Sequence, residues 1–436
     1  MKEWYFETKY RFFNFLKRYE ETIKKIFVVV VIVAIVLYLY YLQPLVAKSE
    51  MFAPISEIFS IALGFFLATS LHIFKDRFKK VFEDELKVNH SYSQLNKQYQ
   101  NLYDYSINNN KEQVFKYHCI FANTENNLSL DDIIIEDEAV QFVPPVFVEQ
   151  HISQLISCHK ASYVTNSMLL RLKGAHFDKE NRKLVLKTMR TKNIYSLCMN
   201  RACDYSVDGL TLRQLYESFP RITSLEESVF SNHIGIQVLI RSKDGYIALV
   251  KRKFDSTVSK NGLCASFATK YSTNEVTGSK NKDIKSSYRV TTDILLKWIL
   301  DKLNAKFANK GAFTFERSNL KFLGLGQELY ECGRPQMFFM YDTMKNRSEL
   351  EEILDLDDSS NNNYNSETEM YFVKPKDIEF DKETRCTSLV NYYYKNKKID
   401  KNVFKLIEDA CLASIWHMAY YNNHRICDYS DSLDVD

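Results

Sequence analysis

The sequence predicts a membrane-anchored α+β protein, in which an N-terminal two-helix transmembrane hairpin precedes a larger cytosolic domain. Three observations predict this class: two long apolar runs near the N-terminus, Lys and Arg residues on the outer side of both runs, and alternating strand-like and helix-like segments in the rest of the chain. The 436 residues are 45% hydrophobic and 26% charged, a globular composition that allows roughly two to four domains.

The transmembrane hairpin is predicted over residues 26–74. No residue from Ile26 to Ala47 carries a charge, and the run from Met51 to Phe74 contains only Glu57 and His72 as titratable residues. At 1.5 Å per residue the first run reaches about 33 Å, enough to cross a hydrocarbon core of about 30 Å. A secretory signal is a poorer interpretation, because a second span follows at once without an intervening cleavage site.

The distribution of Lys and Arg predicts the orientation of this hairpin. Seven basic residues precede the first span and five follow the second, whereas the loop between them offers only Lys48. Because positive residues stay on the cytosolic side, both termini are expected in the cytoplasm and the protein in the inner membrane. The nine cysteines, an odd number without a C-x-x-C pair, also indicate a reducing compartment and make a zinc site improbable.

Small residues form a stripe along the second apolar run. Small side chains allow close approach of helices in lipid, so the stripe predicts either self-association or packing against the first span of the same chain. The residues of this predicted transmembrane association face are Ser56, Ser60, Gly64 and Ala68.

The predicted organisation of the chain has four parts. A cytosolic segment (1–25) precedes the hairpin (26–74), and a juxtamembrane helical linker (75–117) connects the hairpin to a cytosolic domain (118–436) with a core at 183–345 and C-terminal helices at 380–425. The formal net charge of +3 excludes a broadly basic coat for duplex nucleic acid.

The best local signal is a β-hairpin near residue 240. Two strand-like runs, 235–240 and 246–250, flank an Asp244-Gly245 turn, and the second run ends in basic residues. A polar loop, a helix from about 291 to 308 and two further strands follow. This order resembles a Nudix fold over residues 230–345 or so, and it implies a Nudix-like α/β/α domain.

The resemblance lacks the acidic box with which Nudix hydrolases bind magnesium. When the box is aligned with residues 297–304, Asp301 is the single acid left, and Arg289 occupies the position of the upstream glutamate. One carboxylate cannot hold the metal ions that would activate water. We therefore expect no catalytic residue, no metal, no cofactor and no enzymatic activity.

Basic residues gather where the phosphates of a Nudix substrate would lie. Cations bind phosphodiesters well, and aromatic rings offer stacking surfaces for bases. The alternative is a solvated basic loop that binds no ligand. The candidate ligand-binding residues are Lys251, Arg252, Lys253, Phe267, Lys270, Tyr271, Arg334 and Gln336.

A membrane hairpin fused to a Nudix-like domain without its box resembles the transmembrane–Nudix effectors of bacterial CBASS antiphage systems. The resemblance implies an antiviral-defence effector that binds a cyclic oligonucleotide from a cyclase encoded nearby, oligomerises with itself and disrupts the lipid bilayer. Two alternatives stay open: a membrane-anchored Nudix-type hydrolase of nucleoside diphosphate derivatives, and a membrane scaffold with no nucleotide ligand.

Overall fold

The computed structural model describes part of the chain in detail. The described residues are 95, 98–100, 102–106, 114–124, 126–157, 167–217, 219–252, 262–272, 289–307, 313–354, 367–381, 387–404 and 407–430. The chain divides into two compact units, and the description below concerns the unit formed by Val88–Ile156 and Thr165–Asp436.

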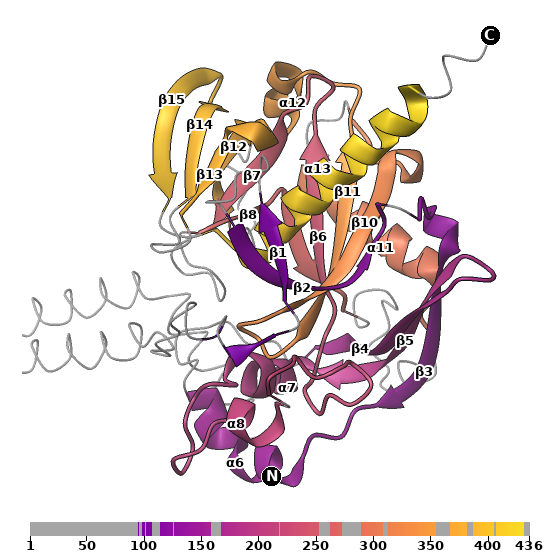
Figure 1. Ribbon diagram of the computed structural model, residues 1–436, viewed down its shortest axis with the longest axis vertical. Helices are drawn as coiled ribbons and strands as arrows, with labels where there is room; N and C mark the ends of the chain where they lie inside the picture. Colours follow the sequence, from indigo (N-terminus) through magenta and orange to yellow (C-terminus); the bar gives the residue numbers. More distant parts are fainter. Residues whose placement is uncertain are drawn as a thin grey trace, which may run out of the picture. The chain divides into compact units, whose positions relative to one another are not determined.

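A 12-stranded mixed sheet forms the centre of this unit, with the strand order β1-β2-β10-β11-β6-β7-β12-β14-β13 (Figure 1). Strand β15 pairs with β14, β8 with β7, and β9 with β6. The bounds are β1 Tyr103–Ser106, β2 Val114–Ala122, β6 Gly235–Arg241, β7 Ile247–Arg252, β8 Leu263–Ala265, β9 Phe267–Lys270, β10 Leu320–Glu328, β11 Arg334–Asp342, β12 Glu367–Val373, β13 Ile378–Phe380, β14 Thr387–Tyr394 and β15 Lys397–Phe404.

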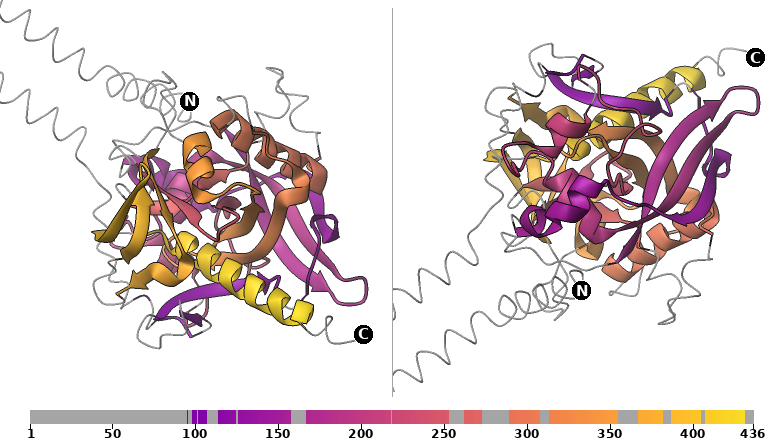
Figure 2. Two further views of the ribbon diagram at one scale, coloured as in Figure 1. Left: turned by 90° about the horizontal axis from the view of Figure 1, so that it is seen from above. Right: turned by 90° about the horizontal axis from the view of Figure 1, so that it is seen from below.

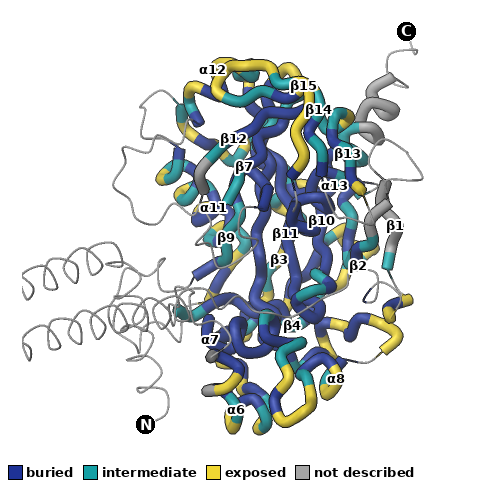
Figure 3. The backbone as a smooth tube through the Cα atoms, turned by 90° about the vertical axis from the view of Figure 1, so that its left-hand side faces the viewer, coloured by how far each residue is buried: buried dark blue, intermediate teal, exposed yellow. Residues whose placement is uncertain are grey.

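The parallel pair β6 and β11 lies at the middle of the sheet and is buried on both faces (Figure 3). Burial on both faces explains why both strands read as almost continuous apolar runs. The predicted hairpin is confirmed: β6 and β7 are antiparallel, and Gly245 has φ +85°, which glycine adopts without steric cost.

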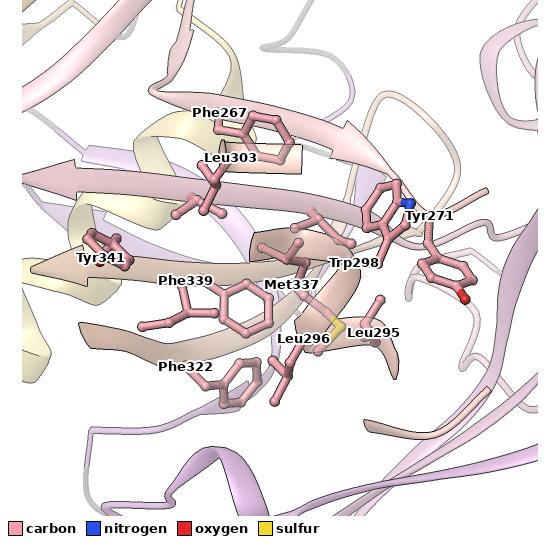
Figure 4. Close-up of a cluster of buried hydrophobic side chains, with 14 of the residues drawn as sticks. Phe267, Tyr271, Leu295, Leu296, Trp298, Leu303, Phe322, Met337, Phe339 and Tyr341 are labelled. Atoms are coloured by element: carbon pink, nitrogen blue, oxygen red, sulfur yellow. The ribbon is translucent and has the colours of Figure 1, made fainter. Parts of the chain in front are cut away.

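One face of the sheet packs against helix α11 (Thr292–Phe307), which confirms the helix predicted at 291–308. Leu295, Leu296 and Trp298 of α11 belong to one core cluster with Met337 and Phe339 of β11 (Figure 4). A second sheet of three strands, ordered β3-β5-β4, contributes to the same core. Its strands are β3 Ile133–Gln141, β4 Met168–Asp178 and β5 Lys183–Lys192. Leu350 and Leu354 of helix α12 (Arg347–Leu354) also belong to this core cluster.

The other face packs against helix α13 (Asp409–Ser430), so that α11 and α13 lie on opposite sides of the sheet (Figure 2). Leu412 and Ile415 of α13 share a core cluster with Phe338 and Met340 of β11. Side chains of adjacent strand residues point to opposite faces, so β11 supplies both cores alternately. Further helices of the described residues are α6 Val146–Ser157, α7 Asn193–Tyr195, the π-helical turn η4 Ser196–Arg201 and α8 Leu212–Tyr216, with short 3-10 turns at Leu130–Asp132, Arg317–Asn319 and Pro375–Asp377.

The fold class and the inner-membrane location predicted from the sequence are wrong for the described part of the chain. None of its helices is both long and apolar enough to cross a bilayer. In the described part, the apolar runs of β6 and β11 are strands buried between two layers of the protein, since apolar composition reports burial and not the nature of the surroundings. The segments 26–47 and 51–74, on which the hairpin prediction rested, lie outside the described residues, as do Ser56, Ser60, Gly64 and Ala68.

Two predicted boundaries also differ from the observed elements. Strand β1 and the beginning of β2 fall within the segment 75–117, for which a helical linker was expected. Strands β14 and β15 occupy much of the segment 380–425, for which helices were expected, and α13 is the one helix among the described residues of this segment.

Candidate functional site

A cavity of about 230 Å³ lies where the first residues of β6 and β11 meet η4 and the end of β9. Thirteen residues line it: Ser196, Leu197, Arg201, His233, Gly235, Gln237, Arg252, Ala268, Thr269, Lys270, Arg334, Gln336 and Glu408. The lining is polar, and four of its side chains are those of Arg or Lys.

Strand register explains why cations distant in sequence converge on this cavity. Because β6 and β11 are parallel, their first residues lie at the same edge, and Gly235 pairs with Gln336. Strand β9 runs antiparallel to β6, so its last residue, Lys270, also lies opposite Gly235. Arg252 ends β7, which is antiparallel to β6 as well.

Gly235 permits a close approach between two of these strands. A Cβ atom at this position would lie 2.0 Å from Oε1 of Gln336, far inside the van der Waals limit. The side chain of Gln336 therefore lies directly over the β6 backbone, and its amide donates to Glu328 Oε2 at 3.1 Å. A glycine at the start of β6 is thus part of the construction of the cavity.

Carboxylates partly balance the three arginines. Arg334 pairs with Glu328 and with Glu331, in the latter case through Nε at 2.8 Å from Oε2. Arg201 lies 3.5 Å from Glu331, and Arg252 lies 3.1 Å from Glu408. These arginines are therefore held in place before any ligand binds.

Lys270 has a neutral partner instead. Its Nζ donates to Oδ1 of Asn193 at 2.6 Å, and no ion pair joins it to a carboxylate of the described residues. Burial, and after it the positive charges of Arg201 and Arg334, lower the pKa of Lys270 to about 7, and Glu331 opposes this shift. The cavity thus holds an excess of positive charge, which disfavours the protonated form of this lysine.

Ser196 and His233 form a hydrogen-bonded pair in the wall of the cavity, with 2.7 Å between Oγ and Nδ1. Arg334 donates to the other ring nitrogen, Nε2, at 3.3 Å, so the hydrogen of the neutral imidazole is on Nδ1 and is donated to Ser196. Burial, Arg334, Lys270 and Arg201 hold the pKa of His233 well below its usual value. Because a catalytic His must accept the proton of its serine, this pair is not an activated nucleophile.

The structure brings four of the eight candidate ligand-binding residues together: Arg252, Lys270, Arg334 and Gln336 all line the cavity. Lys251, the neighbour of Arg252 in β7, points away and pairs with Glu369 at 3.0 Å, since adjacent strand residues face opposite sides. Lys253 lies outside the described residues.

The two aromatic candidates do not face the cavity. Phe267 and Tyr271 are 6% and 1% exposed and belong to the core beside α11, where the Tyr271 ring lies 5.0 Å from that of Trp298. The expectation that they stack on bases is therefore wrong. Asp301, the last acid of the aligned box, is exposed on α11.

Sequence reasoning missed Arg201, His233, Gln237 and Glu408. A polar residue inside an apolar strand was a usable signal for Gln237, but nothing in the sequence marks the π-helical turn that presents Arg201. Within the described ranges, no group of three His, Cys, Asp or Glu residues is arranged to hold a metal ion. No protein-family model matches the sequence, and no curated protein matches it either.

The buried carboxylate of Glu328 should make stability depend on pH. Burial raises the pKa of Glu328 from 4.5 to about 7, with Arg334 opposing this shift. A carboxyl whose pKa is raised in the folded state stabilises the fold fully below pH 4.5, and this contribution is lost as the pH rises to about 7. We expect the free energy of unfolding of the wild type to fall relative to that of Glu328→Gln across this window, measured by urea denaturation.

Glu349→Gln is the matched control for this pH profile. Glu349 is exposed, and the hydrogen bond from the backbone N–H of Asn346 lowers its pKa. The stabilisation that Glu349 gives to the fold is therefore lost only below pH 4.5, outside the window in which Glu328 acts. If the free energy of unfolding of Glu328→Gln ran parallel to that of the wild type from pH 4.5 to 7, the raised pKa of Glu328 would be contradicted.

Proposed function

We propose that this chain binds a small phosphate-bearing ligand of the nucleotide class in the cavity between β6, β9, β11 and η4. The observation that carries the proposal is the convergence of Arg201, Arg252, Lys270 and Arg334 from four different elements. A bound anion would stabilise the protonated form of Lys270, which the neighbouring arginines destabilise in its absence.

Phosphate suits this arrangement better than a single carboxylate does. Three arginines present planar donor forks, and the oxygens of a phosphate group can accept from several forks at once. The cavity, at about 230 Å³, lies below the range of about 300–1,000 Å³ typical of drug-sized ligands, so it favours one nucleotide unit inside and the rest of a larger ligand at the mouth.

Cyclic oligonucleotides are the most specific form of this proposal. In the effectors that the sequence resembles, such a ligand signals viral infection. We propose that a ligand of the same class binds in this cavity.

Isothermal titration calorimetry of the full chain tests the proposal with inorganic phosphate, a mononucleotide and a cyclic dinucleotide. We expect saturable binding of a nucleotide that weakens with added salt. Because the pKa of Lys270 is about 7, binding at pH 7 should take up about half a proton, read from buffers of different ionisation enthalpy.

Lys270→Arg is the control for proton uptake. Arginine keeps the positive charge at all accessible pH values, so the variant should bind the same nucleotide with less proton uptake than the wild type, and the difference between the two is the contribution of Lys270. Absence of binding for every anion of the panel would refute the proposal, and binding of inorganic phosphate alone would reduce it to an anion site.

A further inference from the structure

The amine of Lys270 has surroundings that suit a nucleophile. Its side chain is half-buried and lines the cavity, so a small molecule can reach it. The hydrogen bond to Asn193 Oδ1 uses one N–H of the amine, which leaves the lone pair of the neutral form directed elsewhere. Arg201 and Arg334 lie close enough to Lys270 to perturb it electrostatically.

We propose that Lys270 forms an imine with the carbonyl carbon of a small aldehyde or ketone that also carries an anionic group. The anionic group would lie on Arg201 and Arg334, and these arginines would bring the carbonyl to the amine. This inference goes beyond nucleotide binding, because it assigns covalent chemistry to a residue of the cavity.

Charged groups on several elements set the protonation of this amine. Arg201 on η4 and Arg334 on β11 disfavour the charged form, Glu331 in the loop before β11 favours it, and His233 is neutral. Near pH 7 about half of Lys270 is therefore the neutral amine, against roughly one part in 2,500 for an ordinary lysine. Desolvation and adjacent cations are the known means of activating a lysine nucleophile.

The chemical step balances without an oxidant or a reductant. The lone pair of Nζ attacks the carbonyl carbon, the C–N bond forms as the C=O π bond opens, and the oxygen takes up a proton. One proton of Nζ then passes to this oxygen, which leaves as water, and the resulting protonated imine keeps the positive charge of the proton that the oxygen took up from solvent. The positive charges of Arg201 and Arg334 stabilise negative charge as it develops on the oxygen.

Reductive trapping tests the inference on the full chain at about pH 7, with sodium cyanoborohydride and no nucleotide. Pyruvate supplies a carboxylate, dihydroxyacetone phosphate supplies a phosphate, and acetone supplies a carbonyl without an anion. Peptide mapping by mass spectrometry is expected to show Lys270 modified about 100-fold faster than the exposed Lys401, by at least one of the two anionic probes. Whichever anionic probe reacts faster identifies the anion that the cavity accepts.

Two variants separate this chemistry from a structural role of Lys270. Lys270→Arg should abolish the fast adduct. Arg201→Gln should slow it, because the anionic group loses a partner, and should move the pH midpoint of trapping upward, since one repelling charge is gone. Modification of Lys270 no faster than that of Lys401 overturns the inference, and equal rates with acetone overturn the role of the arginines. Neither result depends on nucleotide affinity, which is measured separately by calorimetry.

Discussion

Replacing Arg252 and Lys270 together by glutamine is expected to weaken nucleotide binding by about 100-fold or more. A hydrogen bond to a charged group is worth about 1.5–3 kcal/mol, so two lost contacts exceed the ~2.7 kcal/mol of a hundredfold change. Both residues line the cavity, from the ends of β7 and β9. The dissociation constants of wild type and variant, measured by calorimetry at one salt concentration, check this prediction.

The control is Lys398→Gln with Lys401→Gln, which removes two positive charges from the exposed strand β15. It should change affinity little, because exposed charges at a distance are screened by salt. Arg252 pairs with Glu408, so Lys270→Gln alone serves as a second variant that breaks no ion pair of the described residues. If Lys270→Gln and the double variant of Arg252 and Lys270 both bound the nucleotide as tightly as the wild type, the ligand would bind elsewhere on the protein.

Replacing Arg190 by leucine is expected to lower the free energy of unfolding by about 3–5 kcal/mol, because a buried carboxylate would lose its partner. Arg190 of β5 and Asp137 of β3 form a two-pronged ion pair, with distances of 2.7 and 2.6 Å and side chains 2% and 1% exposed. Asp137 also accepts from the backbone N–H of Val290 at 2.6 Å, just before α11. Urea denaturation measures the loss.

Arg241→Leu is the matched control, since Arg241 pairs with Asp342 at 2.6 Å but is 28% exposed. Pairs of this kind contribute about 0–1 kcal/mol, so the variant should be close to the wild type. The double variant Asp137→Leu with Arg190→Leu should regain much of the lost stability, because it removes both buried charges. Equal stability of Arg190→Leu and Arg241→Leu would show that this pair does not hold β3 to β5.

Local patterns determined several elements of the fold correctly. The Asp244-Gly245 turn between two apolar runs predicted the β6–β7 hairpin, and helical spacing of apolar residues predicted α11. These features depend on neighbours in the sequence, so the sequence contains the information that specifies them. The segment 380–425 shows the limit of such patterns: helices were expected there, yet strands β14 and β15 occupy much of it.

The sequence by itself also determined that Arg252, Lys270, Arg334 and Gln336 belong to a cationic region, and only the tertiary structure decided how they work together. Strand register placed Lys270 opposite Gly235, the π-helical turn η4 brought Arg201 to the same cavity, and Phe267 lies in the core. The lowered pKa of Lys270 arises from burial and from charges distant in sequence. Both causes act through space, and a linear pattern of residues does not encode the distances on which they depend.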